Sequence, residues 1–126
     1  MPFHGATESD IAHSLVALKR ALKTRLGTSL EKLVMFGSRA RGDYNEESDI
    51  DIAVIVNRLD RNLKKEVIDL VADIELEYLV PLSTLVLSSQ AHKVLMQRER
   101  RIALDIEREG VPLWRRKIYG TTSGRS

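Results

Sequence analysis

The sequence contains no cysteine, few aromatic residues and no long hydrophobic run, and each absence narrows the possible classes of protein. None of its 126 residues is a cysteine, which excludes disulfides and thiolate metal sites and fits a reducing compartment such as the cytoplasm. No apolar run approaches the ~20 residues of a membrane-spanning helix, and the N-terminus lacks the basic-then-apolar pattern of a secretory signal. We therefore expect a cytoplasmic protein without a membrane segment.

Charge, histidine content and length exclude further classes. The 20 lysine and arginine residues are nearly balanced by 18 acidic ones, for a net charge of +2, which gives no ground for a nucleic-acid-binding protein. His4, His13 and His92 have no second histidine or carboxylate at ligand spacing, so no histidine metal site is expected. The length suits one domain with its own core, but not a catalytic domain plus a substrate-binding domain.

Apolar periodicity predicts one α/β domain. Apolar residues recur every three or four positions between Thr7, a helix cap, and Gly27, a helix end, and recur in the same way over 61–79. Other segments are predicted from apolar runs and caps: strands over 33–36, 49–56 and 82–87, a last helical region over 90–109 and an edge strand over 111–114. The expected order alternates helices and strands, which is typical of a small sheet flanked by helices.

Two predictions concern the C-terminal part of the chain. In the last helical region, Leu95, Ile102 and Ile106 are expected to face inward while the arginines face outward. The domain is expected to span residues 1–114. The basic segment 115–126, with Arg115, Arg116 and Lys117, is expected to be a disordered tail that offers contacts for a phosphate or a partner.

The segment from Leu33 to Val56, LVMFGSRARGDYNEESDIDIAVIV, carries the residues that predict chemistry. Alternate side chains share a face of a strand, so Asp49 and Asp51 point the same way among apolar neighbours. Two carboxylates in that setting repel each other, and a bound divalent cation would neutralise both.

The residues before these acids are suited to phosphate. Gly37 lets a ligand approach the backbone, and Ser38 offers a hydroxyl together with unpaired N–H groups at a helix start. Arg39 and Arg41 add guanidinium groups, which match phosphate oxygens in pairs. A phosphate cradle followed by a metal-binding carboxylate pair predicts a site for a nucleoside triphosphate with magnesium.

Both motifs together resemble those of the polymerase-β-type nucleotidyltransferases. The matching residues are GSRARG, from Gly37 to Gly42, and the run from Ser48 to Asp51, and the similarity is strongest to the minimal, MNT-type members. This resemblance implies a single-domain fold of the α/β (α+β) class, with a small mixed sheet in which the two motif strands are adjacent.

The resemblance also implies a reaction and roles for residues. A hydroxyl attacks the α-phosphorus of a nucleoside triphosphate, here ATP, and pyrophosphate leaves. Asp49 and Asp51 would be the catalytic acids and would share two Mg²⁺ ions. The nucleotide and its phosphates would be bound by the residues of the first motif and by the serine before the acids, namely Gly37, Ser38, Arg39, Arg41 and Ser48.

The sequence departs from the family pattern at one position. Members of the family usually carry a third carboxylate at the start of the next strand, where this chain is expected to have Pro81. Ser83 lies nearby, but a hydroxyl is a poor magnesium ligand beside a carboxylate. We expect Mg-ATP to bind, the second Mg²⁺ to be held weakly, and transfer to be slow or to depend on a residue of a partner.

The resemblance finally implies a biological role with several alternatives. MNT-type proteins are similar to antitoxins of HEPN-type ribonuclease toxins, some of which they silence by attaching AMP to a tyrosine. The leading hypothesis is such an adenylyltransferase, with the HEPN toxin as a separate chain. Alternatives are an antitoxin that acts by binding alone and an enzyme for a small acceptor such as an aminoglycoside. Self-association and a role for Tyr44 remain open.

Overall fold

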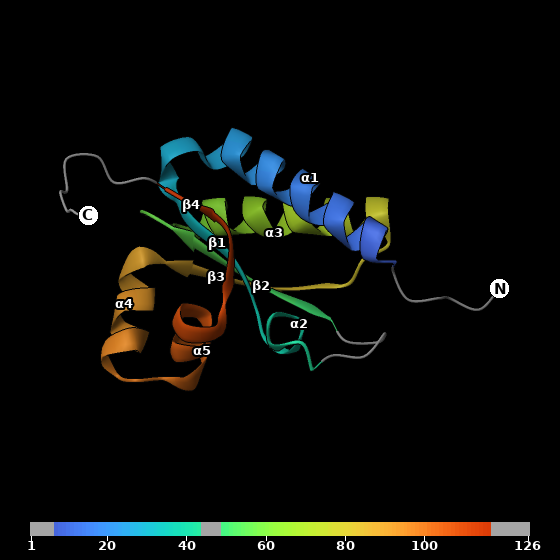
Figure 1. Ribbon diagram of the computed structural model, residues 1–126. Coiled ribbons are helices and arrows are strands. Elements are labelled where there is room, and N and C mark those ends of the chain that lie inside the picture. Colours follow the sequence, from blue (N-terminus) through green and yellow to red (C-terminus); the bar gives the residue numbers. More distant parts are fainter. Residues whose placement is uncertain (1–6, 44–48, 117–126) are drawn as a thin grey trace.

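The computed structural model describes residues 7–43 and 49–116. Tyr44, Ser48 and Lys117 lie outside these residues. Within them, no helix combines the length and the apolar character needed to cross a membrane. The elements, labelled in Figure 1, are α1 (Glu8–Leu26), η1 (Gly27–Ser29), β1 (Leu30–Phe36), α2 (Ser38–Arg41), β2 (Ile50–Val56), α3 (Arg61–Tyr78), β3 (Leu82–Ser88), α4 (Ser89–Gln97), α5 (Arg101–Glu109) and β4 (Val111–Arg115).

The four strands form one mixed sheet in the order β3-β2-β1-β4. β1 is antiparallel to β2 and to β4, whereas β2 is parallel to β3. The predicted fold class and the predicted adjacency of the two motif strands, β1 and β2, are therefore confirmed.

The two faces of the sheet are covered by different helices. Ile50, Ile52 and Val54 of β2 are buried against α1 and α3, together with the apolar residues of those helices. Ala53 and Ile55 point to the opposite face, where they pack with Ile106 of α5. Figure 1 shows α1 and α3 side by side on one face and α4 and α5 on the other. Because β2, like its neighbour β1, is buried on both faces, its register is firmly set.

The first helix matches its prediction at both ends. The Thr7 side chain accepts a hydrogen bond from the N–H of Asp10, and the Asp10 carboxylate accepts one from the N–H of Thr7, which is the reciprocal capping box. At the other end Gly27, with φ 54°, ends the helix. The stripe between them is buried at Ile11, Leu18, Leu22 and Leu26.

The last helical region differs from its prediction because it is two helices. α4 ends at Gln97, Glu99 takes a left-handed conformation with φ 52°, and α5 begins at Arg101. No glycine or proline marks this turn, so the pattern contained no signal for it. The turn rotates α5 so that Ala103 and Ile106 are buried, while Ile102 is 40% exposed. The expectation that Ile102 faces inward is wrong.

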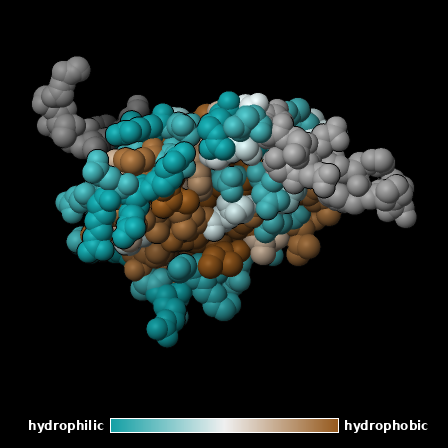
Figure 2. All heavy atoms as spheres, turned by 90° about the horizontal axis from the view of Figure 1, so that it is seen from below, coloured by the Kyte–Doolittle hydropathy of each residue, from teal (hydrophilic) through white to brown (hydrophobic). Residues whose placement is uncertain are grey.

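The face that carries α4 and α5 is partly apolar at its surface. Figure 2 views the molecule from this side and shows a hydrophobic region across the middle, surrounded by hydrophilic side chains. Leu85 and Leu87 of β3 are only partly buried against the cluster on this face. α4 and α5 therefore leave a part of the sheet accessible.

His92 is a buried polar residue of α4. Only 6% of it is exposed, and its Nε2 atom has no hydrogen-bond partner among the described residues. Burial lowers the pKa of His92, an effect that Lys32 strengthens and that Glu107 and Glu31 oppose. The neutral imidazole is therefore the form that the fold accommodates.

We predict that acid destabilises the protein through His92. A histidine with a lowered folded-state pKa stabilises the fold fully above its ordinary pKa of about 6.5, and this stabilisation is lost as pH falls through the folded-state value. Urea unfolding at about pH 7.5 and about pH 5.5 should show a smaller loss of unfolding free energy for His92→Leu than for the wild type. His13→Leu, at an exposed position, should behave as the wild type; equal losses in all three proteins would contradict the prediction.

Candidate functional site

The predicted site lies where β1 ends and β2 begins. Because these strands are antiparallel, the last residue of β1, Phe36, pairs with Asp51 near the start of β2. Gly37 follows Phe36 and leads directly into α2. The start of the first motif and the acids of the second are thus brought together by strand pairing.

The carboxylate of Asp51 lies against the backbone of Gly37. Gly37 has φ 76°, a conformation that side chains disfavour, and a Cβ atom built on it would lie 2.1 Å from Oδ2 of Asp51. Only glycine therefore allows the carboxylate to lie against the backbone that enters α2. This contact joins the predicted phosphate cradle to the predicted metal ligand.

Asp51 is held in an environment that disfavours its negative charge. Burial raises the pKa of Asp51, and the negative charge of Asp49 raises it further, while a hydrogen bond with Ser83 and the positive charge of Arg41 lower it. A divalent cation between the two acids would offset both the burial and the repulsion. The pair therefore fits a magnesium ion, although no group of three His, Cys, Asp or Glu side chains suited to a metal occurs in residues 7–43 and 49–116.

The residue beside Asp51 on the next strand is Ser83, not Pro81. β2 and β3 pair in parallel, with Asp51 opposite Ser83, and the Ser83 hydroxyl is hydrogen-bonded to Asp51. Pro81 lies one residue before β3, and its carbonyl accepts a hydrogen bond from the N–H of Ile50. Ser83, rather than the predicted Pro81, is therefore the residue of this segment whose side chain lies beside Asp51.

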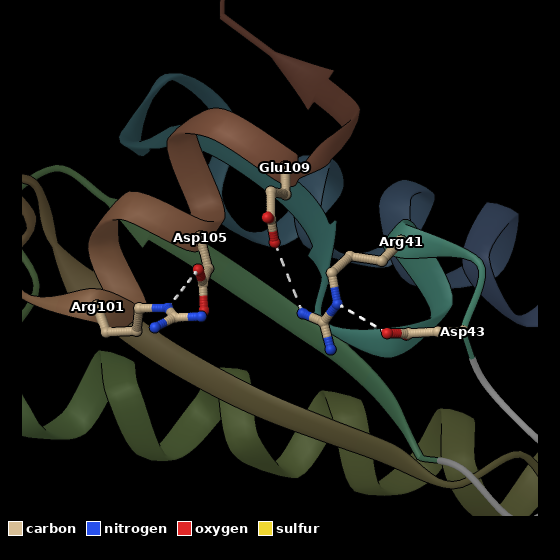
Figure 3. A network of polar contacts seen from close by, with 5 residues as sticks. All are labelled: Arg41, Asp43, Arg101, Asp105 and Glu109. Carbon is tan, nitrogen blue, oxygen red and sulfur yellow. Dashed lines mark hydrogen bonds and ion pairs between the residues drawn. The ribbon is translucent and has the colours of Figure 1, made fainter.

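The two arginines of the first motif have different surroundings. Arg41 is 39% exposed and forms ion pairs with Asp43 at 3.3 Å and with Glu109 of α5 at 3.6 Å, as Figure 3 shows. These two acids raise the pKa of Arg41. The Arg39 side chain is only 9% exposed, and its Nη1 lies 3.8 Å from Glu8 at the start of α1. Arg41 is thus the more accessible of the two arginines, and its positive charge lowers the pKa of Asp51.

The chain matches a family model over most of its length. The model describes a nucleotidyltransferase domain and matches residues 15–109. The chain belongs to this family. The match includes the Gly37–Asp51 contact and ends at Glu109, so both motifs and α5 are parts of the family domain.

Two archaeal relatives are also similar to this nucleotidyltransferase domain. A "Putative protein adenylyltransferase MJ0141" of Methanocaldococcus jannaschii is 31% identical over 78 residues, which are 61% of this chain and 79% of the relative. A second protein of that organism, "Putative protein adenylyltransferase MJ0604", is 44% identical over 70 residues, which are 56% of this chain and 66% of the relative.

A solved structure of "the toxin-antitoxin with AMP-PNP" shares the fold. It has a TM-score of 0.50 and 21% identity, and it covers 79% of this chain and 73% of the other. At this identity the likeness supports the fold of the nucleotidyltransferase domain alone.

The sequence predicted some of the residues that meet at the site and missed some of the contacts between them. The structure places Gly37, Ser38, Asp49 and Asp51 around the junction of β1 and β2; the roles predicted for them, and for Ser48 outside the described residues, remain predictions. The place of Ser83 beside Asp51 depends on the register of β3 against β2, for which the sequence pattern holds no local signal. The contact of Glu109 with Arg41 left no signal, since it joins elements far apart in the chain.

We predict that Gly37→Ala disrupts the site and that Gly42→Ala does not. Both glycines have positive φ. Alanine costs about 1–2 kcal/mol in the left-handed conformation of Gly42 and about 1–3 kcal/mol at Gly37, whose φ of 76° and ψ of −156° lie in a region confined essentially to glycine. A Cβ at Gly42 meets nothing within 4 Å, whereas at Gly37 it meets the Asp51 carboxylate, which adds about 1–3 kcal/mol for overpacking. Calorimetry should show uptake of Mg-ATP by Gly42→Ala and none by Gly37→Ala. Equal uptake by the two variants would refute the importance of the contact.

We also predict that Asp51→Asn stabilises the metal-free protein at neutral pH. Because the folded-state pKa of Asp51 is raised, its ionised form destabilises the fold above that value, and the penalty disappears below the ordinary aspartate range. Thermal melts in EDTA should give Asp51→Asn the higher melting temperature at neutral pH but not in strong acid. The exposed Asp73→Asn is the matched control. A lower melting temperature for Asp51→Asn at neutral pH would contradict this assignment.

Proposed function

We propose that the protein is an adenylyltransferase that moves AMP from Mg-ATP to a hydroxyl of a partner protein. The observation that carries the proposal is the contact of Gly37 with Asp51, which sets the Asp51 carboxylate against the turn into α2, with the charge of Asp49 acting on it. The relatives whose names refer to protein adenylyltransferases support the choice of AMP and of a protein acceptor.

The proposed roles follow the geometry of the site. Asp49 and Asp51 hold the magnesium ion, which when bound offsets the charge of the triphosphate. The backbone at Gly37 and the hydroxyl of Ser38 receive the β- and γ-phosphates, and Ser48 assists them. Of the two arginines, Arg41 is proposed to contact phosphate because it is exposed, whereas Arg39 mainly ties α2 to α1.

Atoms and charges balance in the proposed transfer. The acceptor oxygen bonds to the α-phosphorus, and the bond between that phosphorus and the bridging oxygen breaks. Pyrophosphate leaves with the electron pair, and the hydroxyl proton passes to the solvent. The protein contributes by orienting the α-phosphorus toward the acceptor and by stabilising the charge of the leaving group.

Ser83 is the reason to propose that this transfer is slow. Its hydroxyl lies beside Asp51 on the neighbouring strand, and we propose that it stands in place of the third carboxylate that the resemblance implies. A hydroxyl cannot neutralise a second cation, so the second magnesium ion would be held weakly. This same observation favours the second candidate function, an antitoxin that binds nucleotide and neutralises its partner by association alone.

The proposed partner is a HEPN-type toxin in a separate chain, and the proposed role is that of its antitoxin. The solved toxin-antitoxin structure supports this choice through its similar fold. The surface next to the site also suits a protein, because Leu85 lies two residues beyond Ser83 on the same face of β3 and is only partly buried. Figure 2 shows a hydrophobic region on this side of the molecule. An apolar surface does not suit nucleic acid.

The decisive experiment supplies α-labelled ATP, Mg²⁺ and the product of the neighbouring gene as the proposed HEPN partner, and measures label on that product. Three forms are compared: the wild type, the double variant Asp49→Asn/Asp51→Asn, and Ser83→Asp, which restores a third carboxylate. We expect slow labelling by the wild type and none by the double variant. Ser83→Asp should transfer about tenfold faster or more, as expected for stronger binding of the second cation.

Each outcome separates the two candidate functions. Label that survives in the double variant would refute the proposed acids. Protection of cells from the toxin without any label on it would establish the binding antitoxin in place of the enzyme. Equal rates for the wild type and Ser83→Asp would refute the explanation of slow transfer through Ser83.

A further inference from the structure

An uncovered apolar stripe runs along the outer side of α3. Ile68, Ala72 and Leu76 follow one another at intervals of four residues and therefore share one face of the helix. All three are exposed, Ile68 at 47% and Leu76 at 74%, and Leu79, just past the helix, is 62% exposed. Large apolar side chains with such exposure, gathered on one helix face, are uncommon unless something binds them.

The stripe faces neither α1 nor the sheet. On one side of α3, Glu66 forms an ion pair with Arg25 of α1, and Figure 1 shows the two helices side by side. On the other side, Glu75 accepts a hydrogen bond from the N–H of Leu82 in β3 at 3.0 Å. The stripe lies between these two sides, and no described element covers it.

An acidic row borders the stripe on the side toward α1. It consists of Asp69, Asp73 and Glu77, which are spaced four apart and are all exposed. Asp69 is paired with Lys65 at 3.0 Å, whereas Asp73 and Glu77 have no ion pair within the described part of the chain. This edge of the stripe therefore carries uncompensated negative charge.

We propose that this stripe is the docking site for a helix of a protein partner that is apolar on one face and carries lysine or arginine along its edge. The acidic row is complementary to such an edge and would align the helix along α3. A second copy of this chain fits less well. In a symmetric antiparallel pair of α3 helices, the acidic row of each copy would face the acidic row of the other, and like charges would repel.

The identity of the partner rests on the proposed function, but the surface does not. Docking on α3 would also leave the opposite face of the sheet free, which is the face of Asp51. A partner bound at α3 therefore need not be the protein that accepts AMP. The docking site and the transfer site can thus be tested separately.

The test uses two synthetic helical peptides as long as α3, which has 18 residues, with identical leucine faces and flanked by lysine or by glutamate. Calorimetry should show about tenfold tighter binding of the lysine-flanked peptide to the wild type. Leu76→Ser and Ile68→Ser should each weaken this binding about tenfold. Asp73→Asn/Glu77→Gln should remove the preference between the peptides. The matched control is Val16→Ser on α1, where Val16 is 55% exposed, and it should bind as the wild type.

Three results would overturn the proposal. One is the absence of peptide binding, and another is binding that Leu76→Ser does not weaken. The third is sedimentation showing a dimer that Leu76→Ser dissociates, because the occupant would then be a second copy. Uptake of Mg-ATP by Leu76→Ser, measured in parallel, should equal that of the wild type; its absence from both proteins would remove the proposed function while leaving the peptide result intact.

Discussion

The contact between the backbone of Gly37 and the carboxylate of Asp51 is the constraint on which the site depends. It exists because β1 and β2 pair in antiparallel register, so that the turn after Phe36 meets the start of β2. The core in turn fixes this register. Ile50 and Ile52 are buried under α1 and α3, and because alternate residues of a strand point to opposite faces, Asp51 lies on the other face of the sheet. Strand pairing and burial thus place the acid.

The two neighbouring carboxylates of the site are electrostatically unfavourable, and the rest of the fold holds them in place. Asp51 is partly buried beside a second carboxylate, a combination that destabilises a protein without a cation. The buried strand around it and the ion pair of Arg41 with Glu109, which connects α2 to α5, hold the surrounding elements in place. Such a balance is typical of functional sites, where stability is lost to obtain a prepared binding geometry.

The sequence predicted the parts of the fold that local physics determines. The capping box at Thr7, the ends of α1 and the three long strands follow from short-range patterns, whereas the adjacency of the motif strands was implied by the family resemblance. The break between α4 and α5 was not predicted, because Glu99 adopts positive φ and no glycine marks that position in the sequence. The pairing of Ser83 with Asp51 was missed since the register of parallel strands is set by tertiary packing, and the ion pair of Arg39 with Glu8 depends on how α1 lies over the sheet.

The most direct test of the central claim is to locate the metal nucleotide by NMR. Mn²⁺ with a non-hydrolysable ATP analogue would be titrated into labelled protein, since the unpaired electrons of Mn²⁺ broaden the signals of nearby amides. The account predicts that the amides of Gly37, Ser38 and Asp51 broaden first and that those of α3 keep their signals. It would be contradicted if the broadening centred on another part of the molecule, or if Asp49→Asn/Asp51→Asn broadened in the same way.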